Sequence, residues 1–170
     1  ASSLEDVDRA VDAMKRVEAP LVLMQCNTNY TGVADNLNYL NLSVLKQYED
    51  RYESIVLGLS DHTPGFVSVL GSLALGARVF EKHFTDDTTR PGPDHGFSLD
   101  PNTWFEMVTN ANVLFDTLGD SNKKVEQNEI ESSVVQRRAL RFAKSLKAGM
   151  TINREDLIPL RPAPAGSYKP

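Results

Sequence analysis

The sequence has 170 residues, of which 41% are hydrophobic and 24% charged, and its formal net charge is −5. These values are typical of a folded globular protein and exclude collagen-like, coiled-coil and disordered chains. No run approaches the roughly 18 uncharged apolar residues of a membrane span, and residues 1–12 lack the apolar core of a signal peptide, so we expect a soluble protein with no membrane partner.

Two further expectations concern the cellular compartment and the length of the protein, and they come from the single cysteine and from the first residue. Cys26 cannot form a disulfide within the chain and lies in an apolar run, which favours a reducing compartment, and we expect the cytoplasm. The chain has no initiator Met, so we expect part of a longer protein.

Charge is divided unevenly along the chain. Residues 1–120 carry 8 Lys and Arg against 18 Asp and Glu, whereas residues 121–170 carry 10 against 5, which gives net charges of −10 and +5. An acidic body with a short basic end argues against a nucleic-acid partner. The change in composition also suggests a boundary near residue 120.

Three short runs predict strands. The continuous apolar run at residues 21–26 indicates a strand covered on both faces, residues 54–60 a second buried strand, and residues 77–84 a third strand. Two helices are expected around the first of them. One is capped by Ser2 or Ser3 and ends near residue 20, and the other has an apolar stripe after a loop at 27–35. The stripe is made of Leu37, Leu40, Val44, Leu45 and Tyr48.

Two more helices follow the second and third strands. Pro64 suits the first position of one helix, which would be apolar through residues 66–75. The other is expected from Pro101 to Gly119. Its buried side would consist of Trp104, Met107, Val108, Val113, Leu114 and Leu118.

The resulting order, αβαβαβα, predicts an α/β fold with a parallel sheet. Both a (β/α) barrel and an open doubly wound sheet fit this order. Three strands cannot close a barrel, so a barrel would mean that the chain holds about its last three units. Residues 120–131 are polar and predict a linker, and residues 132–170 resemble the front of a small β-rich module with a turn at 147–149 and a short helix at 153–157.

Several polar residues lie at the carboxyl ends of the three strands. In parallel α/β folds, catalytic and binding residues lie at these ends. Alternation puts Ser60 with His62 on one face, and Glu81 with His83 on one face. Neighbouring strands lie about 4.8 Å apart, so His62 and His83 could reach one ion, with Glu81 or Asp61 beside it.

Ordinary structural roles compete with these interpretations. Asp61 and its neighbours could simply cap the following helix, and two histidines without a recognised ligand spacing are a weak metal signal. Lys82 points away from the histidines, toward a helix or solvent. Cys26 is most simply a small core residue, and His95 a surface residue or a substrate contact. The long loop 85–95 suits a lid or binding element, in which Asp94 could recognise a sugar hydroxyl or simply be solvated.

Several ordered motifs carry a specific resemblance: GLSDHT at 58–63, ALGA at 74–77, EKHFTD at 81–86, RPGPD at 90–94 and FSLDP at 97–101. Together they resemble the sialic acid synthase family, which includes N-acetylneuraminate, legionaminic and pseudaminic acid synthases. VVQRR at 134–138 and LRP at 160–162 resemble the start of that family's C-terminal antifreeze-like (SAF) domain. The resemblance covers nearly the whole chain.

The resemblance implies the C-terminal portion of a (β/α)8 TIM barrel at 1–120, a linker at 121–131, and a truncated SAF domain at 132–170. It implies an enzyme that condenses phosphoenolpyruvate with an N-acetylated hexosamine, such as N-acetylmannosamine, to give a nine-carbon sialic-type acid and phosphate. It also implies a domain-swapped homodimer. The family's phosphate-binding lysines and an early glutamate would lie on strands absent here, so the chain by itself should be inactive.

Site residues are carried over from the resemblance one by one. His62 and His83 match ligands of a divalent metal, usually manganese with magnesium as the alternative, and Glu81 matches a carboxylate beside that metal. The remaining matches are contacts to phosphoenolpyruvate (Ser60, and Thr28 where some members have Asn) and contacts to the sugar (Tyr30, Asp94, and Arg161 reaching across from the partner subunit).

Two other functions compete with this interpretation. A different metal-dependent barrel enzyme, such as a hydrolase, would need a metal-bound water and a base in place of a phosphate site. A non-catalytic carbohydrate-binding module built on the C-terminal part is the other alternative, although residues 132–170 are short for a complete module and the polar strand ends would then have no role.

Overall fold

The structure is a computed structural model that describes residues 2–17, 19–30 and 33–170. The chain divides into two compact units, Ala1–Gly119 and Asp120–Pro170, and each is described by itself. No helix in the described ranges is long and apolar enough to cross a bilayer.

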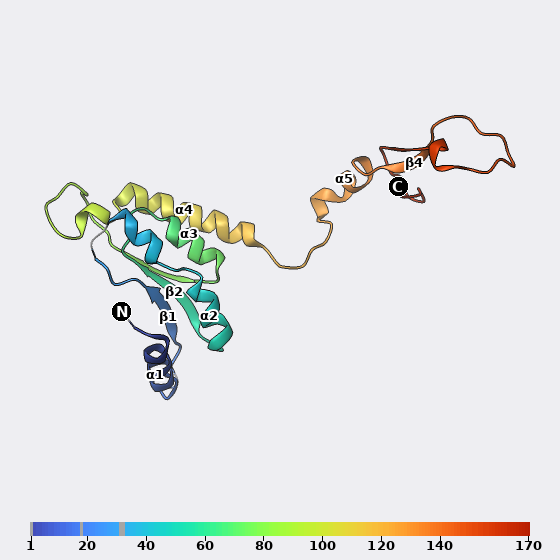
Figure 1. Cartoon of the computed structure of the whole chain (residues 1–170). Coiled ribbons are helices and arrows are strands. Elements are labelled where there is room, and N and C mark those ends of the chain that lie inside the picture. The colour runs from blue at the N-terminus through green and yellow to red at the C-terminus, as the bar shows by residue number, and fades with distance from the viewer. Residues whose placement is uncertain (1, 18, 31–32) are drawn as a thin grey trace. The chain divides into compact units, whose positions relative to one another are not determined.

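The first unit alternates helices and strands along the chain, as the sequence predicts. Its elements are α1 (Leu4–Lys15), β1 (Val22–Cys26), the 3-10 helix η1 (Ala34–Tyr39), α2 (Val44–Arg51), β2 (Val56–Asp61), α3 (Val67–Ala74), β3 (Val79–Lys82), the 3-10 helix η2 (His95–Phe97) and α4 (Pro101–Leu118). The strands form one parallel sheet in the order β1-β2-β3 (Figure 1). The α/β class with a parallel sheet is therefore confirmed.

Helices cover one face of the sheet and leave the other face open. In β2, Leu57 and Leu59 point to the covered face and are buried, with 6% and 0% of their surface exposed. The residues that start each strand on the opposite face are exposed: Val22, Val56 and Val79. The sequence predicts that the first strand is covered on both faces, but in this chain the described helices pack on one face only and Val22 is exposed on the other.

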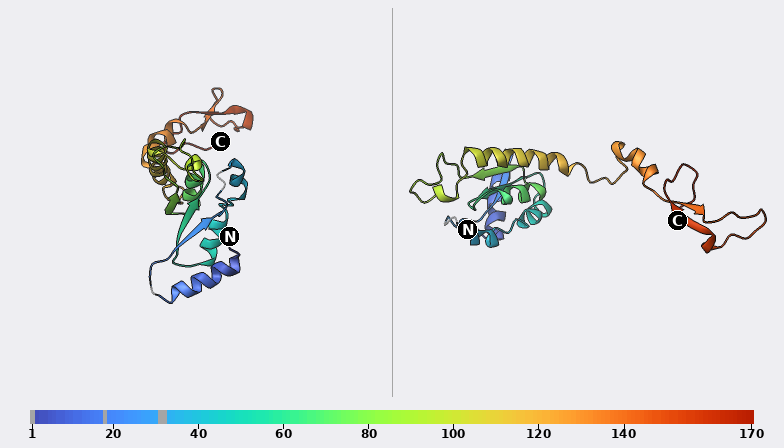
Figure 2. Two further views of the ribbon diagram at one scale, coloured as in Figure 1. Left: turned by 90° about the vertical axis from the view of Figure 1, so that its left-hand side faces the viewer. Right: turned by 90° about the horizontal axis from the view of Figure 1, so that it is seen from above.

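Two apolar clusters hold the helices to the covered face. One joins α1, α2 and β2 and consists of Val11, Leu45, Tyr48, Tyr52, Leu57 and Ala77. The other joins α3 and α4 to β2 and consists of Leu40, Leu59, Val69, Leu99 and Met107. α3 and α4 pack against each other, as their labels in Figure 1 show, and the right view of Figure 2 shows the full length of α4 in yellow.

The expected buried side of α4 is too wide. Met107 is buried, but Val108, Val113 and Leu118 are exposed, because α4 packs through a narrow stripe against α3 and the sheet. The ends of α4 agree with the sequence: the Asp100 side chain accepts a hydrogen bond from the Thr103 N–H, and Gly119 follows the last turn.

Two other helices begin later than the sequence predicts. Asn41 has a φ of 49°, which interrupts the stripe between η1 and α2, so the expected second helix is split in two. Gly65 has a φ of 69°, a left-handed conformation that cannot belong to a right-handed helix, so α3 starts at Val67 and not at Pro64. α1 does start where expected, with a reciprocal capping box between Ser3 and Asp6.

The second unit contains a short helix and a two-stranded antiparallel sheet. Its elements are η3 (Gln127–Glu129), α5 (Ile130–Val135), β4 (Ala139–Phe142), η4 (Arg154–Asp156) and β5 (Leu157–Leu160). The expected boundary between linker and module, at 131–132, falls within α5. The turn at 147–149 is confirmed by the Met150 N–H to Lys147 C=O bond, and the expected helix at 153–157 is the single 3-10 turn η4.

Candidate functional site

The candidate site lies on the open face of the sheet, at the carboxyl ends of the strands. Ser60 of β2 is the register partner of Glu81 of β3, and the Ser60 hydroxyl donates to Glu81 Oε1 at 2.7 Å. His62 and His83 come two residues later along the same face. The predicted grouping of Ser60 with His62 and of Glu81 with His83 is thus what the structure shows.

The two imidazole rings face one another at these strand ends. Their centroids are 5.0 Å apart, with an angle of 70° between the ring planes. His62 is buried, with 3% of its surface exposed, and its Nδ1 lies 3.8 Å from the Cys26 Sγ. The Tyr30 ring stacks at a tilt against His62, with 4.1 Å between centroids, and it lies 6.1 Å from the His83 ring.

His83 is supported from the loop that follows β3. The buried Phe97 ring packs behind it, with 4.9 Å between centroids, and the Asp94 Oδ2 lies 3.7 Å from its Nδ1. The Leu99 N–H donates to the His83 carbonyl at 2.9 Å, which brings the end of the loop back beside its start. Asp94 therefore reaches the histidine pair although it is eleven residues away in the sequence.

The loop that carries Asp94 is held by its own side chains. Thr85 Oγ1 and His95 Nδ1 are 2.7 Å apart, the Arg90 guanidinium donates to Asp86 Oδ1 at 2.6 Å, and the Thr89 hydroxyl donates to Asp87 Oδ1 at 2.7 Å. His95 thus has a structural role in this loop.

Electrostatics favour a neutral imidazole at His62. Burial lowers the pKa of His62 below its ordinary value, and the neighbouring His83 lowers it further. The Asn27 backbone and the carboxylates of Asp61 and Glu81 oppose this shift. A neutral imidazole is the form that binds metal ions.

Asp61 and Lys82 do not join this face. Their side chains lie on the covered face and are 0% and 1% exposed, and the Lys82 Nζ donates to Asp61 Oδ2 at 2.9 Å. Of the two carboxylates expected beside the ion, Glu81 lies on the face of the histidines, whereas the alternation of the strand turns Asp61 to the opposite face, so Asp61 cannot be a ligand. Lys82 does point away from them, as expected, to the face that the helices cover, where its ammonium pairs with the buried Asp61 carboxylate.

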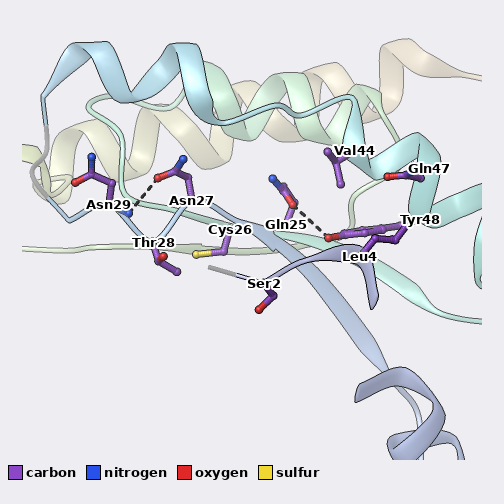
Figure 3. Close-up of a pocket in the computed structure, with 10 residues that line it drawn as sticks. All are labelled: Ser2, Leu4, Gln25, Cys26, Asn27, Thr28, Asn29, Val44, Gln47 and Tyr48. Carbon is purple, nitrogen blue, oxygen red and sulfur yellow. Dashed lines mark hydrogen bonds between the residues drawn. The ribbon is translucent and has the colours of Figure 1, made fainter. Parts of the chain in front are cut away.

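A pocket of ≈ 660 Å³ opens beside the histidines, along the free edge of β1. Figure 3 shows its lining: Ser2, Leu4, Gln25, Cys26, Asn27, Thr28, Asn29, Val44, Gln47 and Tyr48. Thr28 is the one predicted site residue among them. Cys26 joins the pocket to the site, since its sulfur contacts His62, and the interpretation of Cys26 as a core residue is wrong.

The structure tests whether these side chains suit a divalent metal ion. Two adjacent imidazoles, one of them favoured in the neutral form, are donors that such an ion accepts. Within the described ranges no three His, Cys, Asp or Glu side chains are arranged to hold an ion together. The pair fits a site that takes its other ligands from water, from substrate or from residues outside this chain.

Arg161 belongs to the second unit and is exposed. The carbonyl of the next residue, Pro162, accepts a hydrogen bond from the Arg141 guanidinium at 2.8 Å, which fixes the local backbone. The structure brings together Ser60, His62, Glu81, His83, Tyr30 and Asp94, and does not place Arg161 relative to them.

Comparison with known proteins identifies the same family that the sequence motifs resemble. The family model described as "NeuB family" matches residues 1–123. The chain belongs to the NeuB family, the sialic acid synthases. An N,N'-diacetyllegionaminic acid synthase of Legionella pneumophila is 34% identical over 164 residues, covering 94% of this chain and 45% of the relative, and one from Campylobacter jejuni is 31% identical over 165 residues, covering 95% and 48%.

Solved structures of the NeuB family share the fold. The N-acetylneuraminic acid (sialic acid) synthetase of Leptospira borgpetersenii, crystallised with citrate, matches with a TM-score of 0.69 and 28% identity, over 78% of this chain and 45% of that one. The chain spans about half the length of the curated relatives it matches.

Sequence reasoning missed two contacts of the histidine pair, Phe97 and the Cys26 sulfur, and it missed the ion pair of Asp61 with Lys82 on the opposite face. Strand register would have found Lys82, because Asp61 and Lys82 immediately precede the two histidines at matching positions. Phe97 begins the FSLDP motif, but its packing against His83 depends on the course of the long loop, which the motif does not specify.

Proposed function

We propose that this chain carries the metal-binding and sugar-binding part of a sialic acid synthase. The proposed reaction joins C3 of phosphoenolpyruvate to the aldehyde carbon of an N-acetylated hexosamine. One water is consumed, the new ketone forms at C2, and inorganic phosphate leaves. The observation that carries the proposal is the pairing of His62 with His83 on the face that also holds Ser60, Glu81 and Asp94.

His62 and His83 would hold the divalent ion, manganese or magnesium. When bound, such an ion supplies Lewis-acid polarisation of the sugar aldehyde. The partial burial of the pair keeps both rings in place before any ligand arrives. Tyr30 and Phe97 restrict the two rings from either side.

Hydrogen-bonding groups around the pair are assigned to the two substrates. Ser60 contacts phosphoenolpyruvate, with Thr28 at the mouth of the adjoining pocket as a second contact. Glu81, held by the Ser60 hydroxyl, accepts the proton of the water that adds to C2. Asp94 and Tyr30 bind the sugar, whose hydroxyl groups suit a carboxylate and a phenol.

The rest of the enzyme is assigned to sequence outside these residues. We infer that the three strands are the C-terminal part of a (β/α)8 barrel whose interior is the open face, since Ser60, His62, Glu81 and His83 all lie on that face. Residues 132–170 would begin the SAF domain. Lysines that bind the phosphate would come from the remaining strands, so the 170-residue chain alone would not turn over. The free Cys26 thiol suits a reducing compartment such as the cytoplasm.

Arg161 is assigned to the sugar of the partner subunit in a domain-swapped homodimer. Its planar, permanently charged guanidinium suits carbonyl and hydroxyl oxygens. The test uses the full-length protein, by which we mean a chain of the same length as the relatives that contains these 170 residues. Two inactive variants of this protein are mixed. Arg161→Ala subunits combined with His62→Ala subunits should recover activity in heterodimers; confirmed heterodimers that stay inactive would refute sharing of the site.

Phosphate release tests the proposed reaction directly. The full-length protein should release phosphate from phosphoenolpyruvate only when Mn²⁺ and an N-acetylated hexosamine are both present, in equal amounts with the new sugar acid. A metal-dependent hydrolase would release phosphate without the sugar, and a binding module would release none. Either result would overturn the proposal.

A further inference from the structure

Three consecutive residue pairs join the ends of β2 and β3. Ser60 faces Glu81 in the register and Asp61 faces Lys82, and the next residues on the two strands are His62 and His83. The first and third pairs lie on the open face, and the second lies on the covered face. The ion pair of Asp61 and Lys82 is therefore the last link between the strands before the histidines.

The Lys82 ammonium binds the chain on both sides of His62. Its Nζ donates to Asp61 Oδ2 at 2.9 Å and also donates to the backbone carbonyl of Thr63. The side chains of Lys82 and Asp61 are 1% and 0% exposed, so water does not compete for these bonds. One cation from β3 thus holds the residue before His62 and the residue after it.

Asp61 extends this hold to the following helix. Its Oδ1 accepts from the Thr63 N–H at 2.9 Å and from the Thr63 hydroxyl at 2.7 Å, and its Oδ2 also accepts from the Ser68 hydroxyl in α3. The turn between β2 and α3, which contains Gly65 at positive φ, is therefore tied back to the strand end by side chains.

A buried ion pair is a costly way to stabilise a fold. Removing two charges from water costs about as much as their attraction returns, and an apolar pair of the same shape often stabilises as well or better. What such a pair adds is a defined geometry, since both partners must be met by directed hydrogen bonds. This ion pair immediately precedes the two histidines and lies on the opposite face of the sheet. A defined backbone geometry at this point fixes the positions of the two histidine rings.

We propose that Lys82 and Asp61 are positioning residues that hold His62 opposite His83 at the separation needed to share one divalent cation. This role rests on the proposed function of the histidine pair. Neither residue touches the ion or a substrate, because both lie on the opposite face of the sheet. Their effect passes through the backbone on either side of His62.

Two variants of the full-length protein test this role. Lys82→Met keeps the length of the side chain and removes the ammonium, but it leaves Asp61 unpaired and could prevent folding. The double variant Asp61→Asn/Lys82→Met removes both charges while the Asn side-chain oxygen still accepts from Thr63, so no unpaired charge is left in the core. Lys46→Met, at an exposed lysine of α2, is the matched control.

The deciding measurement is the crystal structure of the metal-free double variant beside that of the unaltered protein. The unaltered rings should lie about 5.0 Å apart, and in the variant they should move apart or occupy several positions. Titration with Mn²⁺, followed by electron paramagnetic resonance, should show a Kd raised roughly 10- to 100-fold, as is usual when the support of a metal ligand is lost. Lys46→Met should match the unaltered protein in both measurements.

The proposal is overturned if the double variant keeps the ring separation and its Mn²⁺ affinity stays within about twofold of the control. Failure of the proposed function would look different. In that case the unaltered protein would bind no Mn²⁺, and the ring positions in the two metal-free crystals would still decide whether Lys82 and Asp61 hold the histidines.

Discussion

Gly58 lies in the middle of β2, between β1 and β3, where the strands leave no room for a side chain. A Cβ atom at this position would be 2.7 Å from the Val79 carbonyl oxygen and 2.9 Å from the Met24 Cγ. The first contact is with backbone, which cannot rotate away. Gly58 therefore permits the strand spacing that places Ser60 beside Glu81 and His62 beside His83.

Gly58→Ala should destabilise the protein by about 1–3 kcal/mol, because the added methyl group forces β3 away from β2. Thermal unfolding followed by circular dichroism measures the loss, and Mn²⁺ affinity should fall with it. Gly96→Ala is the control, since a Cβ there meets nothing within 4 Å and Gly96 has no positive φ. Equal melting temperatures for the two variants would contradict the close approach.

Ser60 links the proposed phosphoenolpyruvate site to Glu81. Ser60→Ala should raise the KM for phosphoenolpyruvate roughly tenfold in the full-length protein, a loss of about 1.4 kcal/mol that is ordinary for one hydrogen bond to a charged group. The KM for the sugar should change much less. An unchanged KM for phosphoenolpyruvate would remove Ser60 from that site.

At the scale of elements, an ion pair joins α1 to the end of α2. The Arg51 guanidinium donates two bonds to the Asp8 carboxylate, both of 2.7 Å, and the Tyr52 hydroxyl donates a third at 2.7 Å. These bonds lower the pKa of Asp8 to about 2. Because the carboxyl has a higher pKa when the chain is unfolded, ionised Asp8 favours the folded state.

The contribution of Asp8 should therefore depend on pH in one direction. It is fully present above about pH 5, where Asp8 is ionised even in the unfolded chain, and it declines as the pH falls toward 2. Asp8→Asn should lower the melting temperature at pH 6, and the difference from the unaltered protein should shrink at pH 3. Asp12→Asn, at an exposed position of the same helix, is the control. If the difference in melting temperature between Asp8→Asn and the unaltered protein increased from pH 6 to pH 3, this account of Asp8 would be contradicted.

Elements with repeated apolar spacing could be predicted from the sequence, and interruptions by single residues could not. The strands, α1 and α4 lie close to their expected positions because periodicity and caps extend over many residues. The breaks at Asn41 and Gly65 depend on one backbone angle each. For the site, alternation correctly paired the strand-end residues, whereas the placement of Asp94 and Phe97 depends on the folding of a long loop.

At the scale of the whole molecule, the first unit has open strand edges and exposed apolar surface. Among the residues that the structure describes, β1 and β3 each have a strand neighbour on one side only, and large apolar residues are exposed on the sheet and on α4. Examples are Val22, Val56, Phe105 and Val113. Open strand edges and apolar surfaces of this kind promote association.

The isolated 170-residue chain should therefore self-associate. Sedimentation velocity should show species larger than 18.8 kDa whose fraction rises with concentration. Joining the chain to the remaining length of its relatives should cover these edges and give a single defined assembly. A monomer of the isolated chain that melts cooperatively would show that these surfaces need no covering.

The central claim is that His62 and His83 together hold the ion on which sugar-acid synthesis depends. Its most direct test is the double variant His62→Ala/His83→Ala of the full-length protein, assayed for Mn²⁺ binding and for sugar-dependent phosphate release. The account predicts that both are lost while the circular dichroism spectrum and the oligomeric state are unchanged. A folded double variant that still binds Mn²⁺ and still releases phosphate in a sugar-dependent manner would contradict it.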